Sequence, residues 1–225
     1  MEHNRAAAER LYYLLGALFI AALITCNLVA NKFISVDLGF KTFVISAGVL
    51  PYPITFLITD VLSELYGQRR TTHVVLSGLV ASVFVLFILW LAAQFPAIEG
   101  SPVDDAMFDT VFRNAWRVIA ASMFAYLFAQ LIDVRLFHFW KKVTGGKKLW
   151  VRNNFSTILS QGVDTTLVVV VLFVGVESWS TMGGYIFDGW FFKVLCAALD
   201  TFVFYGIMAW ARRYFKLGLG EEITF

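Results

Sequence analysis

The stretch PYPITFLITDVLSELYG, from Pro51 to Gly67, holds two carboxylates four residues apart within a run of apolar residues. Asp60 and Glu64 would share one face of a helix, because residues four apart are neighbours on a helix surface. The two prolines near its start remove backbone donors and disfavour helix in the residue before each of them. What these features mean depends on whether the stretch lies in water or in a membrane.

The composition of the whole chain indicates a membrane protein. Of its 225 residues, 59% are apolar and 15% are charged, and the mean hydropathy is +0.73. A helix needs about 20 predominantly apolar residues to cross a bilayer. Six such runs without two-residue alternation cover residues 11–29, 43–66, 74–93, 118–140, 155–176 and 190–211. We therefore predict an all-α integral membrane fold with six transmembrane helices, in a single domain that spans residues 1–225.

The prolines predict an irregularity in the second of these helices. We expect it to be broken at Pro51 and Pro53, because a membrane helix tolerates a break where the freed backbone groups line a cavity. An ordinary proline kink is the alternative. A break beside buried acids would favour a binding site at this point.

Basic residues at the ends of the runs predict the orientation. Twelve of the 18 lysines and arginines fall on one side, which also holds both termini: Arg5, Arg10, Arg69, Arg70, Lys141, Lys142, Lys147, Lys148, Arg152, Arg212, Arg213 and Lys216. The longest loop on the opposite side is acidic. We therefore expect both termini to be cytoplasmic, and we read the net charge of +2 as a topology signal that gives no reason to expect a nucleic-acid partner.

Four aspartates, Asp60, Asp133, Asp164 and Asp200, fall deep inside four different runs. Counted from the nearest cytoplasmic basic residue, they lie about 12 to 18 Å deep, in a hydrocarbon core about 30 Å thick. A charge there costs roughly 2.5 to 3.5 kcal/mol and usually faces the bundle interior or a wet cavity. We expect them to share a polar cavity. Alternatively, some are protonated or paired residues that clamp neighbouring helices.

Two of the aspartates follow a glutamine by three residues. Gln130 with Asp133, and Gln161 with Asp164, therefore share helix faces. Amide and carboxylate groups on one face suit a neutral ligand rich in hydrogen-bonding groups. Arg135 either extends to the cytoplasmic surface or pairs with one of the acids.

The side chains that usually support metal binding or catalysis show no familiar arrangement. The three histidines and two cysteines lack metal-ligand spacing, and no phosphate-binding loop or nucleophile motif is present. We therefore expect no metal, no cofactor and no enzymatic activity. An intramembrane enzyme that uses paired carboxylates as acid and base is the disfavoured alternative.

Two motifs carry a family resemblance that covers essentially all six runs. The stretch AGVLPYPITFLITDVLSELYG resembles a signature of the queuosine precursor transporter family, also called "putative vitamin uptake transporters", at Pro53, Thr55, Phe56, Asp60, Glu64, Tyr66 and Gly67. The stretch LWVRNNFSTILSQGVDTT is similar to the family at Arg152, Asn153, Ser156, Thr157, Gln161 and Asp164. CNLVANK, from Cys26 to Lys32, adds a weaker similarity. Leu167 stands where we would expect Phe in this family.

The resemblance implies uptake of 7-deazaguanine precursors, the 7-cyano and 7-aminomethyl forms, across the bacterial inner membrane for tRNA modification. The predicted substrate site then consists of Asp60, Glu64, Gln130, Asp133, Arg152, Asn153, Gln161, Asp164 and Asp200. The alternative function is the membrane subunit that binds a vitamin for a separate ATP-driven importer. The sequence allows a homodimer but does not require one.

Overall fold

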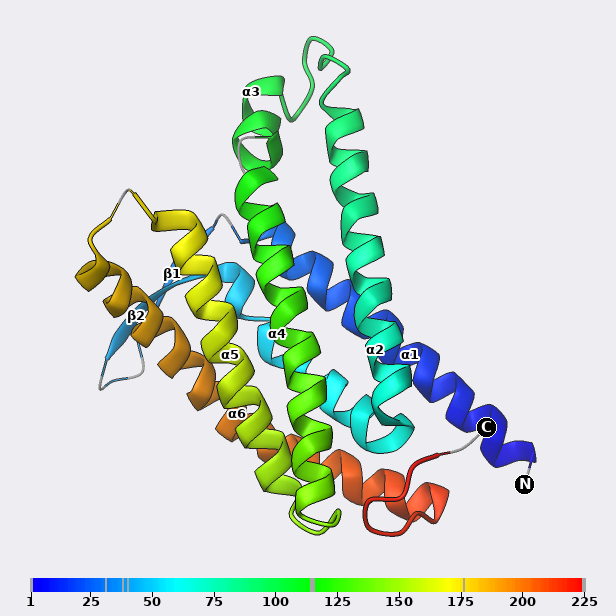
Figure 1. Cartoon of the computed structure of the whole chain (residues 1–225). Coiled ribbons are helices and arrows are strands. Elements are labelled where there is room, and N and C mark those ends of the chain that lie inside the picture. Colours follow the sequence, from blue (N-terminus) through cyan, green and yellow to red (C-terminus); the bar gives the residue numbers. More distant parts are fainter. Residues whose placement is uncertain are drawn as a thin grey trace.

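The chain forms a bundle of long helices with one small β-hairpin at its side (Figure 1). The computed structural model describes residues 2–30, 32–37, 39, 41–113, 116–175 and 177–223. In chain order the elements are α1 (Glu2–Leu28), β1 (Phe33–Asp37), β2 (Thr42–Ser46), the 3₁₀ turn η1 (Ala47–Val49), α2 (Tyr52–Ala92), α3 (Asp105–Phe108), the π-helical turn η2 (Asp109–Arg113), α4 (Trp116–Val143), α5 (Leu149–Phe173) and α6 (Trp179–Phe215). The predicted helical membrane fold is confirmed in its class.

Three stretches of the described chain are long and apolar enough to cross a membrane: Arg5–Leu28, Ala47–Ala92 and Trp179–Phe215. The second of them contains two of the predicted runs, separated by a kink. The helices α4 and α5 have 28 and 25 residues, but polar residues interrupt their apolar sequences. That all six runs cross the bilayer therefore stays a prediction, as does the cytoplasmic position of the termini.

The hairpin corrects the prediction that residues 43–50 begin a membrane helix. Instead, β2 pairs antiparallel with β1, and Asp37 lies opposite Thr42 at the turn. Gly39 has a φ of 81° there, and its N–H donates to Asp37 Oδ1 over 2.9 Å. The strand TFVIS is rich in β-branched residues, which favour strands, but a buried strand and a buried helix are equally apolar. The hairpin packs on α6 through Phe43 and Phe192, whose ring centroids are 5.3 Å apart.

The two prolines mark where a helix begins, so the prediction of a break at Pro51 and Pro53 is wrong. Pro51 occupies the N-cap of α2, and Pro53 lies in its first turn. Proline is tolerated there because the first backbone N–H groups of a helix have no partner within the helix. The preceding residues belong to η1 and β2, so no helix is interrupted.

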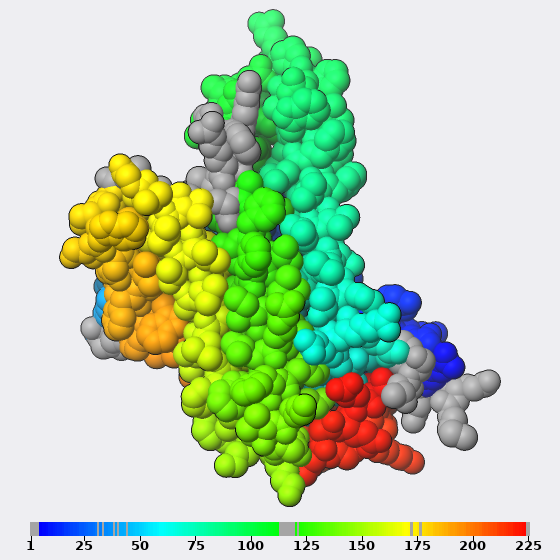
Figure 2. Space-filling view, in the orientation of Figure 1, coloured from blue at the N-terminus to red at the C-terminus, as the bar shows by residue number. Residues whose placement is uncertain are grey.

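The break in α2 lies at Gly67, which has φ 79° and ψ 170°. The C-terminal segment, residues 216–223, covers this kink, and the Ile223 N–H donates to the Leu65 carbonyl over 2.6 Å. Figure 2 shows this segment in red against the cyan part of α2, around the kink, and against the end of α4. The kink thus divides α2 into two helical segments. The Leu65 carbonyl beside the kink accepts its hydrogen bond from a segment outside the helix.

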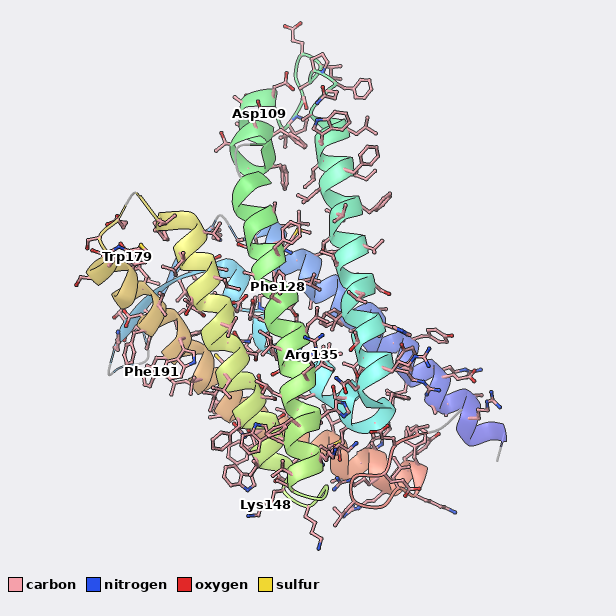
Figure 3. The ribbon with its side chains drawn as sticks, in the orientation of Figure 1. Asp109, Phe128, Arg135, Lys148, Trp179 and Phe191 are labelled. Atoms are coloured by element: carbon pink, nitrogen blue, oxygen red, sulfur yellow. The ribbon has the colours of Figure 1, made fainter. Side chains whose placement is uncertain are left out.

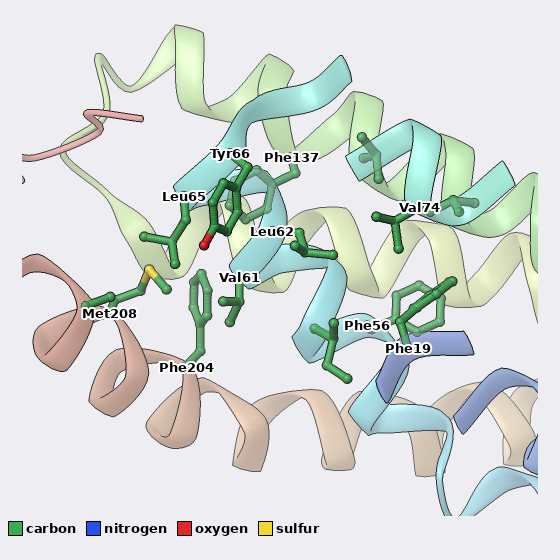
Figure 4. Close-up of a cluster of buried hydrophobic side chains, with 14 of the residues drawn as sticks. Phe19, Phe56, Val61, Leu62, Leu65, Tyr66, Val74, Phe137, Phe204 and Met208 are labelled. Carbon is green, nitrogen blue, oxygen red and sulfur yellow. The ribbon is translucent and has the colours of Figure 1, made fainter. Parts of the chain in front are cut away.

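The first half of α2 lies at the centre of the bundle. From Thr55 to Gly67 every residue except Leu57 is buried. Leu62 and Leu65 belong to an apolar cluster that includes side chains from α1, α4 and α6 (Figure 4). Large apolar side chains on the outer faces are exposed, such as Phe202 at 77%, as expected for helices that face lipid.

Charge is distributed unequally between the two ends of the bundle. Lys148 lies at the end that holds the Gly67 kink, and Asp109 lies at the opposite end (Figure 3). Lys141 at the first of these ends contacts Glu222 of the C-terminal segment at 2.9 Å. This grouping is what the predicted orientation requires, with the basic end in the cytoplasm.

We expect Gly67→Ala to lower the melting temperature of the detergent-purified protein. The left-handed φ strains any side chain, and an added Cβ would overlap the Glu222 carboxylate, so the loss should exceed about 1 kcal/mol. Gly206→Ala is the matched control, because Gly206 lies in α6 with no neighbouring atom in the way. Alanine there should be neutral or stabilise by up to about 1 kcal/mol. Equal melting temperatures for the two variants would contradict this account of the kink.

Candidate functional site

A cavity of about 560 Å³ lies between the hairpin, α1, the start of α2, α4, α5 and α6. Its wall is mostly apolar and aromatic, with a few polar groups, as is usual for small-molecule sites. The residues on which the following argument depends are Phe43, Tyr52, Tyr126, Asp164 and Lys193. Of the nine predicted site residues, Asp164 lies in this wall.

Asp164 is buried and uses only part of its acceptor capacity. Lys193 Nζ of α6 donates to Asp164 Oδ2 over 2.6 Å. Lys193 Nζ also lies 4.2 Å from the centroid of the Tyr52 ring. Asp164 Oδ1 has no partner among the described residues. The cavity wall therefore contains a buried carboxylate that has one oxygen without a hydrogen-bond partner and a cation held beside it.

Gln130 connects the inside of the bundle to the cavity wall. Its Nε2 donates to the Tyr126 hydroxyl over 2.7 Å, and its Oε1 accepts from Thr59 Oγ1 over 3.1 Å. Tyr126 packs edge-on against Tyr52, with ring centroids 5.0 Å apart. Gln130 therefore orients the aromatic wall from behind.

Asp60 and Asp133 lie behind the wall in contact with each other. They come from α2 and α4, which meet here through Thr59 and Gln130, and the two carboxyl groups lie close enough to act on each other electrostatically. Ser160 Oγ of α5 donates to Asp133 Oδ1 over 2.9 Å. The four aspartates therefore do not share one cavity as predicted, because Asp164 lines the cavity whereas Asp60 and Asp133 lie behind its wall.

Glu64 and Arg152 form a buried ion cluster at the basic end. Arg152 Nη2 donates to Glu64 Oε1 over 2.5 Å, and Arg212 Nη2 of α6 donates to the same oxygen over 3.0 Å. Lys141 Nζ of α4 lies 3.8 Å from Glu64 Oε2. The Arg152 side chain is fully buried, and that of Glu64 is 2% exposed. This cluster ties four helices together and leaves little room for a ligand.

The remaining predicted residues do not line the cavity. Asn153 Nδ2 reaches Thr201 Oγ1 of α6 at 3.5 Å. Gln161 is buried one turn from Asp164, and Asp200 is half-buried on α6. Arg135 is exposed on the outside of α4 (Figure 3), where no salt bridge to it is found among the described residues.

The sequence interpretation missed Lys193 and the tyrosines of the wall. Lys193 stands within the apolar run that became α6, and a cation in such a run implies a buried acid as its partner. That signal was available, since Asp164 had been singled out. No comparable signal separates Tyr52 and Tyr126 from the chain's other aromatic residues.

These features define a class: a helical membrane protein with an internal, partly polar cavity, as in solute transporters. The chain belongs to the family described as "putative vitamin uptake transporter", whose model matches residues 46–207, well over half of the chain. No solved structure matches the chain.

Three curated relatives agree in their names. A "probable queuosine precursor transporter" of Bacillus subtilis is 30% identical over 130 residues, which are 57% of this chain and 56% of that protein. A protein of the same name from Haemophilus influenzae is 24% identical over 72% of this chain and 67% of its own length. The "queuosine precursor transporter" of Escherichia coli is 21% identical over 76% of this chain and 74% of its own length. The match thus spans little more than half of the Bacillus protein.

We predict that Glu64→Gln destabilises the protein by about 3 to 5 kcal/mol, because it leaves buried cations without their counter-charge. Glu222→Gln is the matched control. Glu222 also contacts Lys141, but its side chain is 41% exposed, and such pairs contribute about 0 to 1 kcal/mol. Thermal and denaturant unfolding in detergent would measure both. Equal losses of unfolding free energy in the two variants would show that the ion pairs of Glu64 do not stabilise the basic end of the bundle.

Proposed function

We propose that this protein imports queuosine precursors, namely 7-cyano-7-deazaguanine, 7-aminomethyl-7-deazaguanine or both, across the bacterial inner membrane. In this proposal it is a six-span protein with both termini in the cytoplasm. The names of the three relatives supply the substrate class, and the family match supports transport. The cavity beside Asp164 is the proposed substrate site.

The observation that carries this proposal is that Asp164 lies in the cavity wall and that its buried Oδ1 has no hydrogen-bond partner among the described residues. A deazaguanine presents a ring N–H beside an exocyclic amine, and one carboxylate can accept from both. An ionised carboxylate offers about four acceptor positions. Oδ2 can therefore keep its bond to Lys193 and still accept from the substrate.

Lys193 is the proposed donor to the ring carbonyl, which lies next to the ring N–H. Gln161 was also predicted to be in the substrate site, but it does not line the cavity, whereas Lys193 does. The flat faces of a deazaguanine also suit the aromatic wall, because offset or edge-on ring contacts add about 0.5 to 1.5 kcal/mol to the area they bury. Tyr52, Tyr126 and Phe43 supply those rings.

The other predicted residues take supporting roles in this proposal. Gln130 holds Tyr126 in place, while Glu64 and Arg152 close the basic end of the bundle. Asn153 and Asp200 contribute no group to the cavity wall. Substrate contact is therefore assigned to Asp164 and not to all nine residues.

Uptake of labelled precursors tests the function. Cells that lack their own synthesis and uptake of these compounds are compared with and without this chain, with membrane insertion verified by immunoblot. Accumulation only with the chain supports the proposal, and no accumulation contradicts it. Uptake that requires a co-purifying ATPase would instead favour the binding subunit of an ATP-driven importer.

We expect Asp164→Asn to weaken binding of the precursor tenfold or more. An amide offers one acceptor and two donors where two acceptors are needed, and a buried polar group without a partner costs about 1 to 3 kcal/mol. Binding to purified protein, with the precursor and with an analogue that lacks the exocyclic amine, measures the effect. The analogue should bind the wild type tenfold or more weakly, and Asp164→Asn should not distinguish the two compounds.

The matched control for this variant is Thr166→Val. Thr166 lies on the same helix and is exposed on its outer side. Its replacement by valine should leave the affinity for the precursor and the preference for the exocyclic amine unchanged. Unchanged affinity and unchanged preference for the amine in monodisperse Asp164→Asn would remove Asp164 from the site.

A further inference from the structure

The carboxyl pair formed by Asp60 and Asp133 is buried and has no counter-charge. Asp60 is 2% exposed and Asp133 is 0% exposed. The two carboxyl groups lie close enough to act on each other electrostatically, and Asp60 Oδ1 and Asp133 Oδ2 have no partner among the described residues. No lysine, arginine or histidine of the described chain forms a salt bridge with either. The pair therefore has acceptor capacity and lacks a positive charge.

The other helices around the pair add oxygen atoms and no free cation. From α5, Ser160 Oγ donates to Asp133, and the Thr157 side chain interacts with both carboxyl groups. From α6, Asp200 adds a further acid that acts on Asp60. The pair is therefore enclosed by hydroxyl and carboxyl groups.

The charged and titratable groups nearest along the same helices do not neutralise the pair. On α2, Glu64 is one turn from Asp60, and it is bound to Arg152 of α5. On α4, His138 lies five residues beyond Asp133, and its Nε2 has no partner among the described residues. The charge that balances the pair must come from outside the chain's own ion pairs.

Two ionised carboxylates in contact without a cation are strongly unfavourable inside a protein, because both the loss of solvation and their mutual repulsion oppose ionisation. The pair is therefore suited to hold a proton.

We propose that Asp60 and Asp133 form a proton-binding site of this transporter, separate from the substrate cavity, through which import is coupled to proton entry. This inference rests on the proposed function. One proton binds from outside and is released to the cytoplasm in each cycle, and no bond of the substrate changes. Asp164 recognises the substrate, and the pair supplies the driving ion.

Contacts on two helices connect the pair to the cavity. Thr59, next to Asp60, donates to Gln130, which in turn donates to Tyr126 in the cavity wall. On α5, Ser160 contacts Asp133 and lies one turn from Asp164 on the same helix face. A change in the charge of the pair thus acts on groups that position both the aromatic wall and the substrate carboxylate.

The test uses purified full-length protein in liposomes with labelled precursor. In wild type, an outside-acid gradient of one pH unit should drive accumulation of up to about tenfold for one proton per substrate. In Asp133→Asn, which mimics the protonated pair, gradient-driven accumulation should be lost, while precursor exchange at equal pH should persist. Glu9→Gln, a change in an exposed ion pair on α1, is the control and should behave like wild type.

An infrared measurement without substrate tests the proton itself. The carbonyl band of a protonated carboxyl group should be present in wild type and Glu9→Gln, and weakened or lost in both Asp60→Asn and Asp133→Asn. The inference would be overturned if accumulation by wild type did not depend on the pH gradient or depended on a sodium gradient instead. Full gradient-driven accumulation by Asp133→Asn would also overturn it. If wild type neither binds nor exchanges the precursor, the proposed function fails, and the infrared band still decides whether the pair holds a proton.

Discussion

The pairing of Glu64 with cations from three other helices is the constraint on which the rest of the structure depends. Arg152 of α5, Arg212 of α6 and Lys141 of α4 all meet this carboxylate, and Lys141 also reaches the C-terminal segment. Taking these charges out of water is favourable only when each finds a partner with good geometry. The cluster therefore fixes how four helices approach one another at the basic end. It also explains why α2 can tolerate a break at Gly67, because the segment that covers the kink is held there by the same charges.

Three polar layers follow one another along α5 from this end. Arg152 lies in the ion cluster, Ser160 contacts the carboxyl pair, and Asp164 faces the cavity. At 1.5 Å per residue, these layers are about 12 Å and about 6 Å apart. A single helix thus sets the order of the layers, and the polar residues that interrupt its apolar sequence are the groups that each layer needs. The same residues explain why α5 is less clearly a membrane span than α1 or α6.

The sequence predicted the positions of the helices better than it predicted the contacts between them. Long apolar runs identify helices because the bilayer requires both length and internal hydrogen bonds, so α1 and α4–α6 were found, as were both halves of α2. The hairpin was missed because its apolar, β-branched residues satisfy the same hydropathy criterion as a helix. Depth along each helix placed Asp60, Asp133 and Asp164 near one level, but depth says nothing of rotation about the helix axis. Which acid faces the cavity, which faces another acid and which faces an arginine is decided by packing between segments far apart in the sequence.

The number of cations around each buried acid is what distinguishes their roles. Glu64 has three cationic partners, and the loss of any of these ion pairs would leave a buried charge without its partner. The role of Glu64 is therefore to hold the helices together. Asp164 has one, Lys193, and keeps a free oxygen, so it can accept a neutral donor without losing its counter-charge. Asp60 and Asp133 have none among the described residues, which is why a proton is the proposed partner of this pair. Four buried carboxylates are therefore suited to different tasks, and the difference lies in partners that come from other helices.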